Sequence, residues 1–492
     1  MKKKGILLVL ILFVFTAKAQ FYNHEWLIGY WPMQYSKGRI SFDSTSYTYT
    51  SEFRKMPFEG TQGNICDAQG NFLMSSNGVW IANANNDTML NGSGLNPGYF
   101  VNGWPNGLLI TNGNFFVPTP GDTLGYTLFH QTEVDPSLAN TNLYFTTVNM
   151  MLDGGLGGVN SKNNLITIDS LGWGLNACKH ANGQDWWVIC MQNYSHKVFK
   201  ILYSKFGIIS VDSQVVSTIS PIGGILTQLP INANGNVMAY SMYDNAIDRN
   251  SSVVICDFDR CTGLFSNTRI VPVCSGQYIW GMSFSPNGEF LYANTSTYIF
   301  QINTNTLTVD TVATYDGFSF PIPSAATTFW AQYLAANGKI YLTSGNGVQH
   351  LHEVNYPDSA GLACDVQQHA VSLGVWHFRA VPNHPNYNLG PVVGSICDTL
   401  SVGLAETAHD FRFSISPNPV SDGVVKLTYL LPQNKAGVLE VFDLTGQRVF
   451  SQQLPPWSTL QFLQLSELSN GLYTCVIRSG NEKTAKKLVV MK

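Results

Sequence analysis

The stretch Gly281–Leu307, GMSFSPNGEFLYANTSTYIFQINTNTL, predicts three short strands joined by two turns. Between the first two strands stands Ser-Pro-Asn-Gly at 285–288, where Pro presets φ for a turn and Asn-Gly tolerates positive φ. The second and third strands are expected at 290–292 and 298–302, and a polar run at 303–305 ends the unit. Because so small an antiparallel sheet cannot bury both faces alone, we expect it to pack between similar neighbours.

Similar phrases return along the chain at spacings of roughly 45 to 55 residues, which fit the four-stranded blades of a β-propeller. We therefore predict an all-β protein in which residues 20–392 form a propeller of seven blades, with six and eight blades as alternatives. The leading strands at 26–31 and 39–42 are expected to complete the last blade by hydrogen bonds between chain ends. The phrases stand at 65–73, 180–188, 231–239 and 334–341.

The composition is that of a protein with large cores and many turns. Hydrophobic residues make up 45% of the 492 residues and charged residues only 12%, a balance typical of all-β secreted proteins. A net charge of −4 gives no reason to expect nucleic acid or an anionic membrane surface as a partner.

The first twenty residues have the three parts of an export signal. Lys2-Lys3-Lys4 precede the apolar run 6–15, and Ala17-Lys18-Ala19 form a small-x-small site. The run is too short to span a bilayer, so the pattern predicts a cleaved signal peptide at 1–19. No later segment is long and apolar enough to cross a membrane, so we expect an exported protein that is soluble or surface-attached.

Nine cysteines follow the predicted signal, and an exported protein can form disulfides. We predict pairing of Cys256 with Cys261 across a tight turn and of Cys364 with Cys397, and a free thiol at Cys475 within an apolar strand pattern. No Cys-x-x-Cys occurs and no His stands at ligand spacing beside these thiols, so no metal site is expected.

A separate block ends the chain. After a linker at 393–410, residues 411–492 show regular short strands separated by turns, which predict a small immunoglobulin-like β-sandwich. The block contains four short motifs in order: Pro417, Asn418 and Pro419; Gly446 within DLTGQRV; Gly471 and Tyr473 within LSNGLY; and Lys486 and Lys487 at the start of KKLVV.

By these motifs the block resembles the C-terminal (type A) sorting domain of type IX secretion system cargo in Gram-negative gliding bacteria. The resemblance implies export across the outer membrane, with the type IX translocon as partner, and a secreted or cell-surface location. It also implies that the motif residues form the sorting signal.

The propeller region carries a second resemblance, through residues such as Ile65-Cys66-Asp67, Asp257-Phe258-Asp259 and Pro382-Asn383-His384-Pro385-Asn386-Tyr387. It resembles the WD-repeat-like (YVTN-like) propellers of large secreted proteins associated with gliding motility or PKD domains. PKD repeats themselves are absent from this sequence. The resemblance implies a fold and an extracellular location, but no activity and no catalytic residue.

No residue spacing selects a catalytic centre, so we assign no catalytic residue and expect no cofactor. The glycine cluster at 153–159 lacks the Lys-Ser/Thr of a phosphate-binding loop. His180 is interpreted as a strand-end histidine, and Asp257 and Asp259 as turn residues. The carboxylates near blade turns are Asp67, Glu133, Asp153, Asp185, Asp244, Glu289, Asp316 and Glu353, and the candidate bases are His180, His350, His352 and His369.

Aromatic side chains on loops could stack against sugars. Trp104, in the loop NGWPNG, is the candidate ligand-binding residue because Gly and Pro flank it. Trp186, Trp187 and Trp280 lie in strand patterns and are interpreted as core residues.

Asp-Ser/Thr pairs followed by an aliphatic residue or Thr occur seven times. They resemble O-glycosylation sites of exported proteins in the same bacterial group; the alternative is that Asp-Thr ends strands well. The pairs begin at Asp43, Asp87, Asp122, Asp169, Asp310, Asp358 and Asp398.

Together these patterns predict a secreted or cell-surface binding or adhesion protein whose partner is an extracellular glycan or a surface protein. The alternative is a hydrolase or lyase acting on polysaccharide or peptide at the propeller mouth, and a third reading is a structural matrix component. A carboxylate pair or Ser/His constellation converging on one end of the channel would favour the enzyme.

Overall fold

The chain divides into two compact units, residues 1–401 and 402–492, which are described separately. No helix among the described residues is long and apolar enough to cross a bilayer. The predicted signal at 1–19, Asp244 and residues 399–410 of the predicted linker lie outside the described part of the chain. The computed structural model describes residues 21–30, 36–133, 141–218, 228–243, 250–321, 324–379, 381–398, 412–421, 423–431, 435–455, 460–480 and 482–491.

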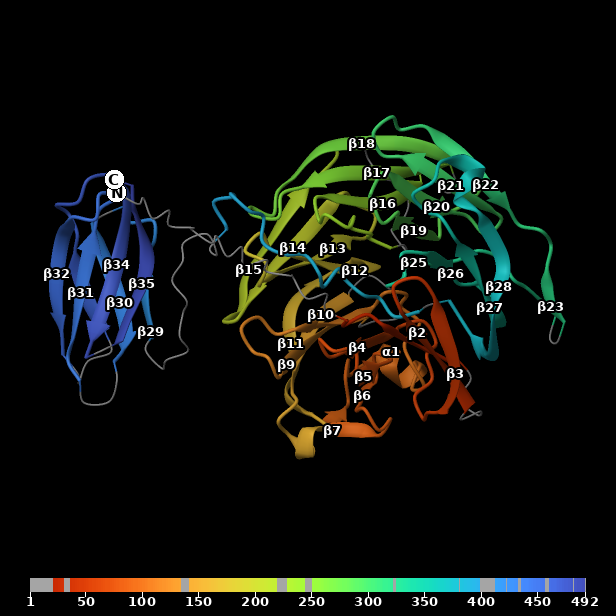
Figure 1. The fold of residues 1–492 in the computed structure, drawn as a ribbon, viewed down its shortest axis with the longest axis horizontal. Helices are drawn as coiled ribbons and strands as arrows, with labels where there is room; N and C mark the ends of the chain where they lie inside the picture. The colour runs from red at the N-terminus through yellow and green to blue at the C-terminus, as the bar shows by residue number, and fades with distance from the viewer. Residues whose placement is uncertain are drawn as a thin grey trace, which may run out of the picture. The chain divides into compact units, whose positions relative to one another are not determined.

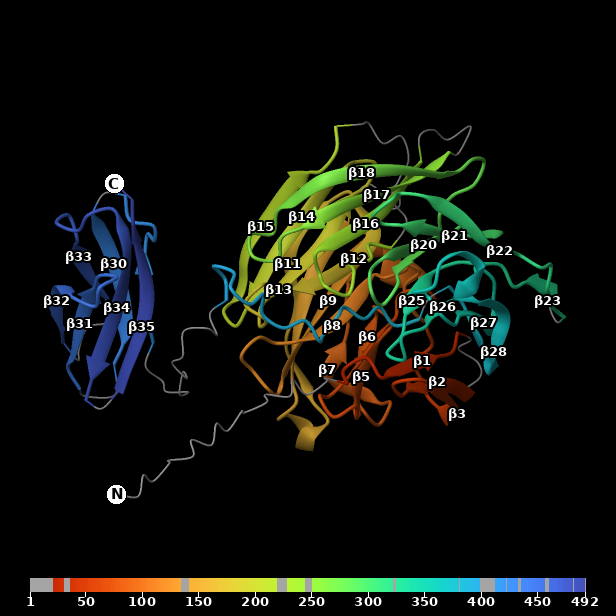
Figure 2. The ribbon, with the colours of Figure 1, turned by 45° about the horizontal axis from the view of Figure 1, so that its top comes forward.

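The first unit is all-β and propeller-like. Its antiparallel sheets are meanders of neighbouring strands that follow one another around a common centre (Figures 1 and 2). A single parallel pair, Gly158 with Leu90, joins the second and third meanders. The first three meanders are β1 (Glu25–Ile28), β2 (Ser36–Phe42) and β3 (Tyr47–Phe53); β4 (Gly63–Cys66), β5 (Phe72–Ser76), β6 (Trp80–Ala82) and β7 (Thr88–Ser93); and β8 (Asn114–Pro118), β9 (Gly125–Glu133), β10 (Thr141–Asn149) and β11 (Gly158–Asp169).

The remaining strands of this unit continue the pattern. They are β12 (Leu171–Lys179), β13 (Trp186–Gln192), β14 (Lys197–Ser204) and β15 (Gly207–Val215); β16 (Val237–Tyr243), β17 (Ser251–Phe258) and β18 (Phe265–Cys274); β19 (Gly281–Phe284), β20 (Phe290–Asn294), β21 (Tyr298–Asn303) and β22 (Val309–Thr314); the hairpin β23 (Ser319–Pro321) and β24 (Ser324–Ala326); and β25 (Gln332–Leu334), β26 (Ile340–Leu342), β27 (Val348–Val354) and β28 (Val366–His377). The short helices are α1 (Tyr99–Gly103), η1 (Asp153–Gly155) and η2 (Gly361–Cys364).

The strands predicted from the 281–307 stretch are present as β19, β20 and β21, and β22 follows as a fourth. Their first turn is tight, because Gly288 adopts a φ of 75° and donates its N–H to Ser285 O at 2.9 Å. Every residue of β19 and β20 is buried. Burial on both faces explains why the sequence of these strands alternates poorly.

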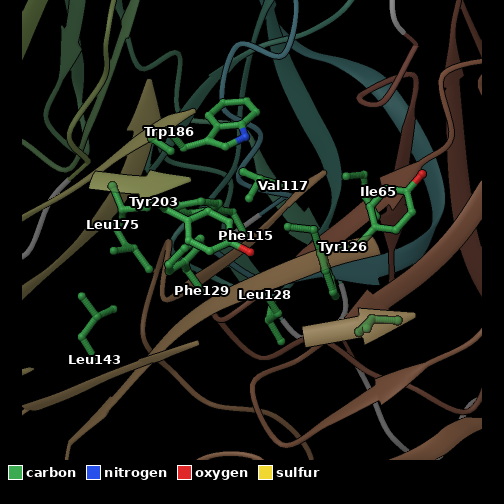
Figure 3. Packing of buried hydrophobic residues seen from close by; sticks show 14 of the residues in the cluster. Ile65, Phe115, Val117, Tyr126, Leu128, Phe129, Leu143, Leu175, Trp186 and Tyr203 are labelled. Atoms are coloured by element: carbon green, nitrogen blue, oxygen red, sulfur yellow. The ribbon is translucent and has the colours of Figure 1, made fainter. Parts of the chain in front are cut away.

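Apolar clusters between neighbouring sheets form the core. The largest runs from β4 to β14 and brings side chains of three meanders together (Figure 3). In it the Phe129 ring lies 5.7 Å from the ring of Phe115 and 5.3 Å from that of Tyr203. Each sheet is therefore stabilised mainly by the face of the next one, as expected for blades.

The ring closes partly as the sequence predicts, because Tyr30 N, just after β1, donates a hydrogen bond to Trp376 O of β28 at 2.9 Å. Strands β1, β2 and β3 form a sheet of their own, and no ladder joins them to β28 in the described residues. Side-chain packing adds to the closure, with the Trp26 ring lying 6.3 Å from the ring of Tyr333 and 5.8 Å from that of Tyr341. The first and last sheets thus meet face to face, because each has an apolar face to bury.

The second unit is a sandwich of two antiparallel sheets around one core. Alternation of buried and half-buried residues along β31 fits a strand with one inward face. One core cluster takes side chains from both sheets. One sheet has β29 (Arg412–Ser416), β30 (Val424–Leu430) and β33 (Leu460–Gln464); the other has β32 (Arg448–Leu454), β31 (Gly437–Phe442), β34 (Gly471–Ser479) and β35 (Glu482–Val490).

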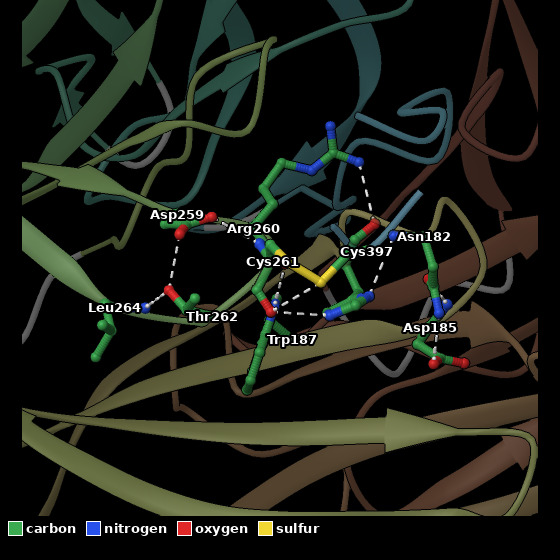
Figure 4. The surroundings of a disulfide bond; sticks show 10 residues. Asn182, Asp185, Trp187, Asp259, Arg260, Cys261, Thr262, Leu264 and Cys397 are labelled. Atoms are coloured by element: carbon green, nitrogen blue, oxygen red, sulfur yellow. Dashed lines mark hydrogen bonds between the residues drawn. A yellow bond between two sulfur atoms is a disulfide. The ribbon is translucent and has the colours of Figure 1, made fainter. Parts of the chain in front are cut away.

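Both predicted disulfides are wrong. Cys261 instead pairs with Cys397, at a Cα–Cα distance of 5.7 Å (Figure 4). Cys256 is a free buried residue of β17, and Cys364 is free and buried in η2, because both side chains pack into cores. Cys475 is free and buried, as predicted. Through the disulfide, residues 393–398, which the sequence assigned to the linker, are tied to the first unit.

Candidate functional site

A cavity of about 250 Å³ lies among the innermost strands of the first unit. The chain itself occupies part of this channel, because residues 381–389, called the axial segment below, run through it. Tyr387 is 1% exposed. Hydrogen bonds to β12, β4, the turn before β16 and β8 hold the segment: Asn383 Nδ2 to Leu175 O (2.6 Å), His384 Nε2 to Asn64 O (2.8 Å), Asn386 Nδ2 to Ala233 O (2.8 Å) and Tyr387 Oη to Phe116 O (2.7 Å).

The channel is polar but uncharged. Its described lining contains Asn and Gln side chains and no Asp or Glu. Burial lowers the pKa of His384 to about 4, so this histidine is neutral near pH 7. Burial also raises the pKa of the Cys178 thiol to about 12. The described lining therefore offers neither a carboxylate pair nor an activated nucleophile.

A second group of side chains lies where the chain enters or leaves the inner sheets. Trp280 directly precedes β19 and Trp330 lies just before β25, and the two rings stack at 4.2 Å with an interplanar angle of 16°. Arg379 follows β28, and its Cζ lies 5.2 Å from the Trp330 ring and 4.6 Å from the Phe378 ring. The Phe378 ring lies 4.9 Å from that of Tyr30. These five residues are called the aromatic mouth below.

Buried amides hold the two tryptophans in place. The wholly buried Asn294 accepts a hydrogen bond from Trp280 N and donates from Nδ2 to Trp330 O, both at 2.8 Å. Gln332 Nε2 donates to Asn294 Oδ1 at 2.7 Å. A Cβ on Gly345 would lie 2.7 Å from the Trp330 ring, so only glycine fits there. The stacked pair is thus fixed by its surroundings and does not depend on a ligand.

Two charged groups at this mouth have no partner among the described residues. Within the described ranges the Arg379 guanidinium forms no ion pair or hydrogen bond, and its Nε is buried. Glu59, 9% exposed, likewise has no hydrogen-bond partner in the described chain, and burial raises its pKa to about 7. Both side chains act on the pKa of Tyr30, which burial raises, so they lie within electrostatic range of the same phenol.

Trp104, the ligand-binding residue proposed from the sequence, lies directly after α1 and is 40% exposed. Trp186 and Trp187 are buried, as predicted. Trp280, however, is only half-buried, so its interpretation as a core residue is corrected. A repeated signal could have found the pair: Ile279-Trp280-Gly281 and Phe329-Trp330-Ala331 both place an apolar residue, Trp and a small residue ahead of an inner strand.

The other candidate residues have structural roles. His180 accepts from Asn182 N and bonds to Cys261 O at 3.1 Å. Asp259 accepts from Cys261 N and Thr262 Oγ1, both at 2.8 Å, and so stabilises a turn, as predicted. Asp257 pairs with Arg269 at 2.6 Å.

The remaining histidines do not assemble a catalytic pair with a nucleophile. His369 Nε2 lies 3.0 Å from Asp316 Oδ2 and its ring stacks on Phe318 at 4.0 Å. Burial lowers the pKa of His352 to about 3. In the described part of the chain, no three His, Cys, Asp or Glu side chains gather closely enough to hold a metal ion.

The first and last sorting-signal residues meet in the second unit. Asn418 Nδ2 donates to Lys487 O and Asn418 Oδ1 accepts from Val489 N, both at 2.8 Å. Val420 then bonds to the same strand, donating to Val489 O at 2.8 Å. The prolines on either side of Asn418, Pro417 and Pro419, have no N–H to pair, so the Asn side chain supplies the contact with β35.

The other motif residues serve turns and strands. Gly446, with a φ of 83°, closes the β31–β32 turn, where Asp443 Oδ1 accepts from Thr445 N and Gln447 N. Gly471 begins β34, and Tyr473 Oη donates to Ser469 O at 2.8 Å. Lys486 and Lys487 are exposed on β35.

The hydroxyl residues of the Asp-Ser/Thr pairs differ in exposure. Ser44, Thr88, Thr123 and Thr311 are exposed, whereas Ser170 and Ser359 are half-buried. Thr399 lies outside the described residues. Asp43 accepts hydrogen bonds from the backbone N–H groups of Thr45 and Ser46. At this pair the alternative interpretation, that the Asp residue serves to end a strand, therefore also has support.

Solved structures similar to this chain have low identity. One is a functionally unknown protein from Desulfotomaculum acetoxidans, with 10% identity, a TM-score of 0.31, and coverage of 87% of this chain and 94% of that chain. Another is a hypothetical selenium-binding protein from Sulfolobus tokodaii, with 10% identity, a TM-score of 0.36, and coverage of 74% and 94%. A comparison with curated protein sequences found no match.

The second unit, in contrast, matches a family. Residues 414–491 match the secretion system C-terminal sorting domain, and the match covers the four predicted motifs. This domain directs export by the type IX secretion system and implies contact with that system. The chain therefore carries a secretion system C-terminal sorting domain and is a secreted or cell-surface protein.

Proposed function

We propose that this chain is a binding or adhesion protein of the cell surface or medium, in which a propeller binds an extracellular glycan or surface protein. In this proposal residues 1–19 are a cleaved signal, 20–392 a WD-repeat-like propeller, 393–410 a linker and 411–492 an immunoglobulin-like sorting domain. Seven meanders follow one another in the described part of the first unit, beginning at β1, β4, β8, β12, β16, β19 and β25. This arrangement supports seven blades.

One observation carries the choice of binding over catalysis. The channel, where propeller enzymes can gather acid and base groups, is occupied by the axial segment and lined in its described part by uncharged amides. A hydrolase or lyase needs a proton donor and acceptor near the substrate. A propeller whose channel is partly occupied by its own chain instead presents its mouth and loops, where Trp104 is one proposed contact.

The experiment is a glycan and polysaccharide array probed with the full chain, followed by product analysis of every sugar that binds. We expect binding without new reducing ends. New reducing ends or unsaturated products would overturn the proposal and favour the extracellular hydrolase or lyase. Absence of binding to glycans and to surface proteins of the producing cells would also overturn it, in favour of a self-associating matrix component.

Recognition by the type IX translocon is proposed to involve the motif residues of the second unit. Removal of residues 412–492 should leave the protein inside the cell, as measured by fractionation of cells and medium. Substitution of Lys486 and Lys487 by Gln is the finer test, because both side chains are exposed and their loss should not disturb the core. Normal export of both variants would contradict the proposed signal.

A further inference from the structure

The aromatic mouth combines features that a fold does not need for its own stability. Buried polar groups in proteins nearly always have hydrogen-bond partners, and an exception needs an explanation. Arg379 is half-buried, yet its guanidinium pairs with no carboxylate in the described chain and its Nε is buried without a partner. The indole N–H groups of Trp280 and Trp330 also have no hydrogen-bond acceptor among the described residues, but both side chains are only half-buried and these two N–H groups are open to solvent.

The backbone holds Arg379 in an unfavourable conformation. Its φ is 59°, in the left-handed region that side-chain-bearing residues seldom adopt. Two contacts fix it there: Arg379 N donates to Ser344 O at 3.1 Å, and Thr343 Oγ1 donates to Arg379 O. Residues held in such conformations concentrate at ligand sites, where the surrounding structure imposes them. The guanidinium is thus presented in one place before any ligand arrives.

The unpartnered groups share one chemical character. A guanidinium and two indole N–H groups are donors without acceptor capacity. A planar guanidinium binds carboxylates through two parallel hydrogen bonds, and the edges and faces of Trp rings contact the C–H surfaces of sugars. The ligand that satisfies both is a sugar ring that carries a carboxylate.

We propose that the aromatic mouth is a site for an acidic carbohydrate, with Arg379 binding the carboxylate of a uronic acid residue and Trp280 and Trp330 contacting its ring. This inference rests on the proposed binding function and gives it a ligand class and a site. The carboxylate receives the guanidinium N–H groups, and hydroxyl groups of the same sugar accept from the indole N–H groups.

Tyr30 belongs to the aromatic mouth, and Glu59 is a polar group near it. Tyr30 lies within electrostatic range of both Glu59 and Arg379. Because burial raises the pKa of Glu59 to about 7, part of this carboxyl is protonated at neutral pH and can donate to a sugar hydroxyl. A second carboxylate in the ligand is therefore tolerated best below pH 7, with Tyr30 and Arg379 as the facing groups.

The test uses the full chain and calorimetric titration with oligogalacturonate, alginate oligomers and a glucuronate polymer, each against its methyl ester. The ester keeps the sugar ring and removes the carboxylate charge. We expect at least one uronate to bind, its ester to bind at least tenfold more weakly, and Arg379→Gln to reduce affinity at least tenfold. Arg379→Lys should fall between, because it keeps the charge and loses the two parallel bonds.

Matched variants separate the site from general effects. Trp280→Ala should weaken uronate binding at least fivefold, whereas Arg269→Gln, at the Asp257 ion pair away from the mouth, should change it less than twofold. Near-ultraviolet circular dichroism checks that each variant is folded. If Arg379→Gln does not fold, Arg379→Lys still tests the role of the guanidinium.

Three results would overturn the inference: equal binding of uronate and ester, uronate binding that survives Arg379→Gln, or no uronate binding. The last result, together with binding of a neutral glycan or a protein on the array, would reject the site and leave the proposed binding function standing.

Discussion

The channel and the aromatic mouth are both built from polar and aromatic side chains, yet they differ in how their polar groups are satisfied. In the channel, Asn383, Asn386 and Tyr387 each donate to a backbone carbonyl in a different part of the ring, in β12, in the turn before β16 and in β8. At the mouth, Arg379 and Glu59 have no partner among the described residues. A satisfied polar group holds a structure together, whereas an unsatisfied charge lowers stability and is available to a ligand.

Polar groups at the centre of a propeller therefore do not by themselves indicate an active site. The channel amides connect neighbouring parts of the ring through side-chain hydrogen bonds, at places where the strands themselves share no backbone hydrogen bonds. We therefore expect substitutions in the channel to change the free energy of unfolding. Substitutions at the mouth should change the pH dependence of stability and the affinity for a ligand.

The largest effect is expected from Tyr387→Ala. The substitution removes a ring packed 6.0 Å from Trp186 and 5.3 Å from Tyr22, together with the bond to Phe116 O. Truncation of a buried aromatic residue costs about 3–5 kcal/mol of unfolding free energy. Urea denaturation of the full chain measures it, and Tyr387→Phe, which removes only the hydroxyl, should cost about 1 kcal/mol. A cost below about 1 kcal/mol for the alanine variant would show that the axial segment does not hold the sheets.

Next in size is Asn383→Ala. Its Nδ2 donates a buried hydrogen bond to Leu175 O at 2.6 Å, so the variant removes a partner of that buried carbonyl. We expect a loss of about 1–3 kcal/mol in the same denaturation experiment. The exposed Asn305, in the turn between β21 and β22, is the control, and Asn305→Ala should change stability by less than about 0.5 kcal/mol. Equal losses for the two variants would remove the distinction between the channel and the surface.

Glu59→Gln tests the mouth. Because the pKa of Glu59 rises from 4.5 to about 7 on folding, the folded state binds more protons than the unfolded state between these pH values. Stability therefore falls as the pH rises through this window, and the penalty is complete above pH 7. We expect the variant to exceed the wild type by about 1–2 kcal/mol at pH 8, a figure reduced for solvent screening.

The same pair of proteins should be nearly equal at pH 4, where the carboxyl is protonated in the folded state and largely so in the unfolded state. Thermal unfolding across pH 4–8 makes the measurement. A pH profile identical in the two proteins would show that Glu59 has a partner in solution.

The smallest effect is expected from Asn418→Ala in the second unit. Asn418 makes two backbone bonds, as the channel asparagines do, but it is exposed, so water replaces the lost partners. We expect the free energy of unfolding of this unit, measured from its own denaturation transition, to fall by about 0.5–1 kcal/mol. Gln453→Ala, at an exposed position of β32, is the control and should be neutral. A loss as large as that of Asn383→Ala would contradict the role given to burial.

Much of the local structure could be predicted from the sequence. The Pro-Asn-Gly turn and its flanking strands appear where the 281–307 stretch places them, because turn chemistry and strand propensity act over a few residues. The sorting motifs were found for the same reason, since they lie in one contiguous block. Cysteine pairing was not found, because Cys261 and Cys397 are 136 residues apart and meet only in the folded ring.

By itself the sequence determined the all-β class, the repeated sheets, the sorting block and the export address, all of which rest on short-range patterns. Only the tertiary structure decided that the axial segment lines the channel and that Trp280, Trp330 and Arg379 meet at one mouth. The physical reason is that these contacts join different sheets, and their partners are set by packing around the ring, which no local spacing encodes.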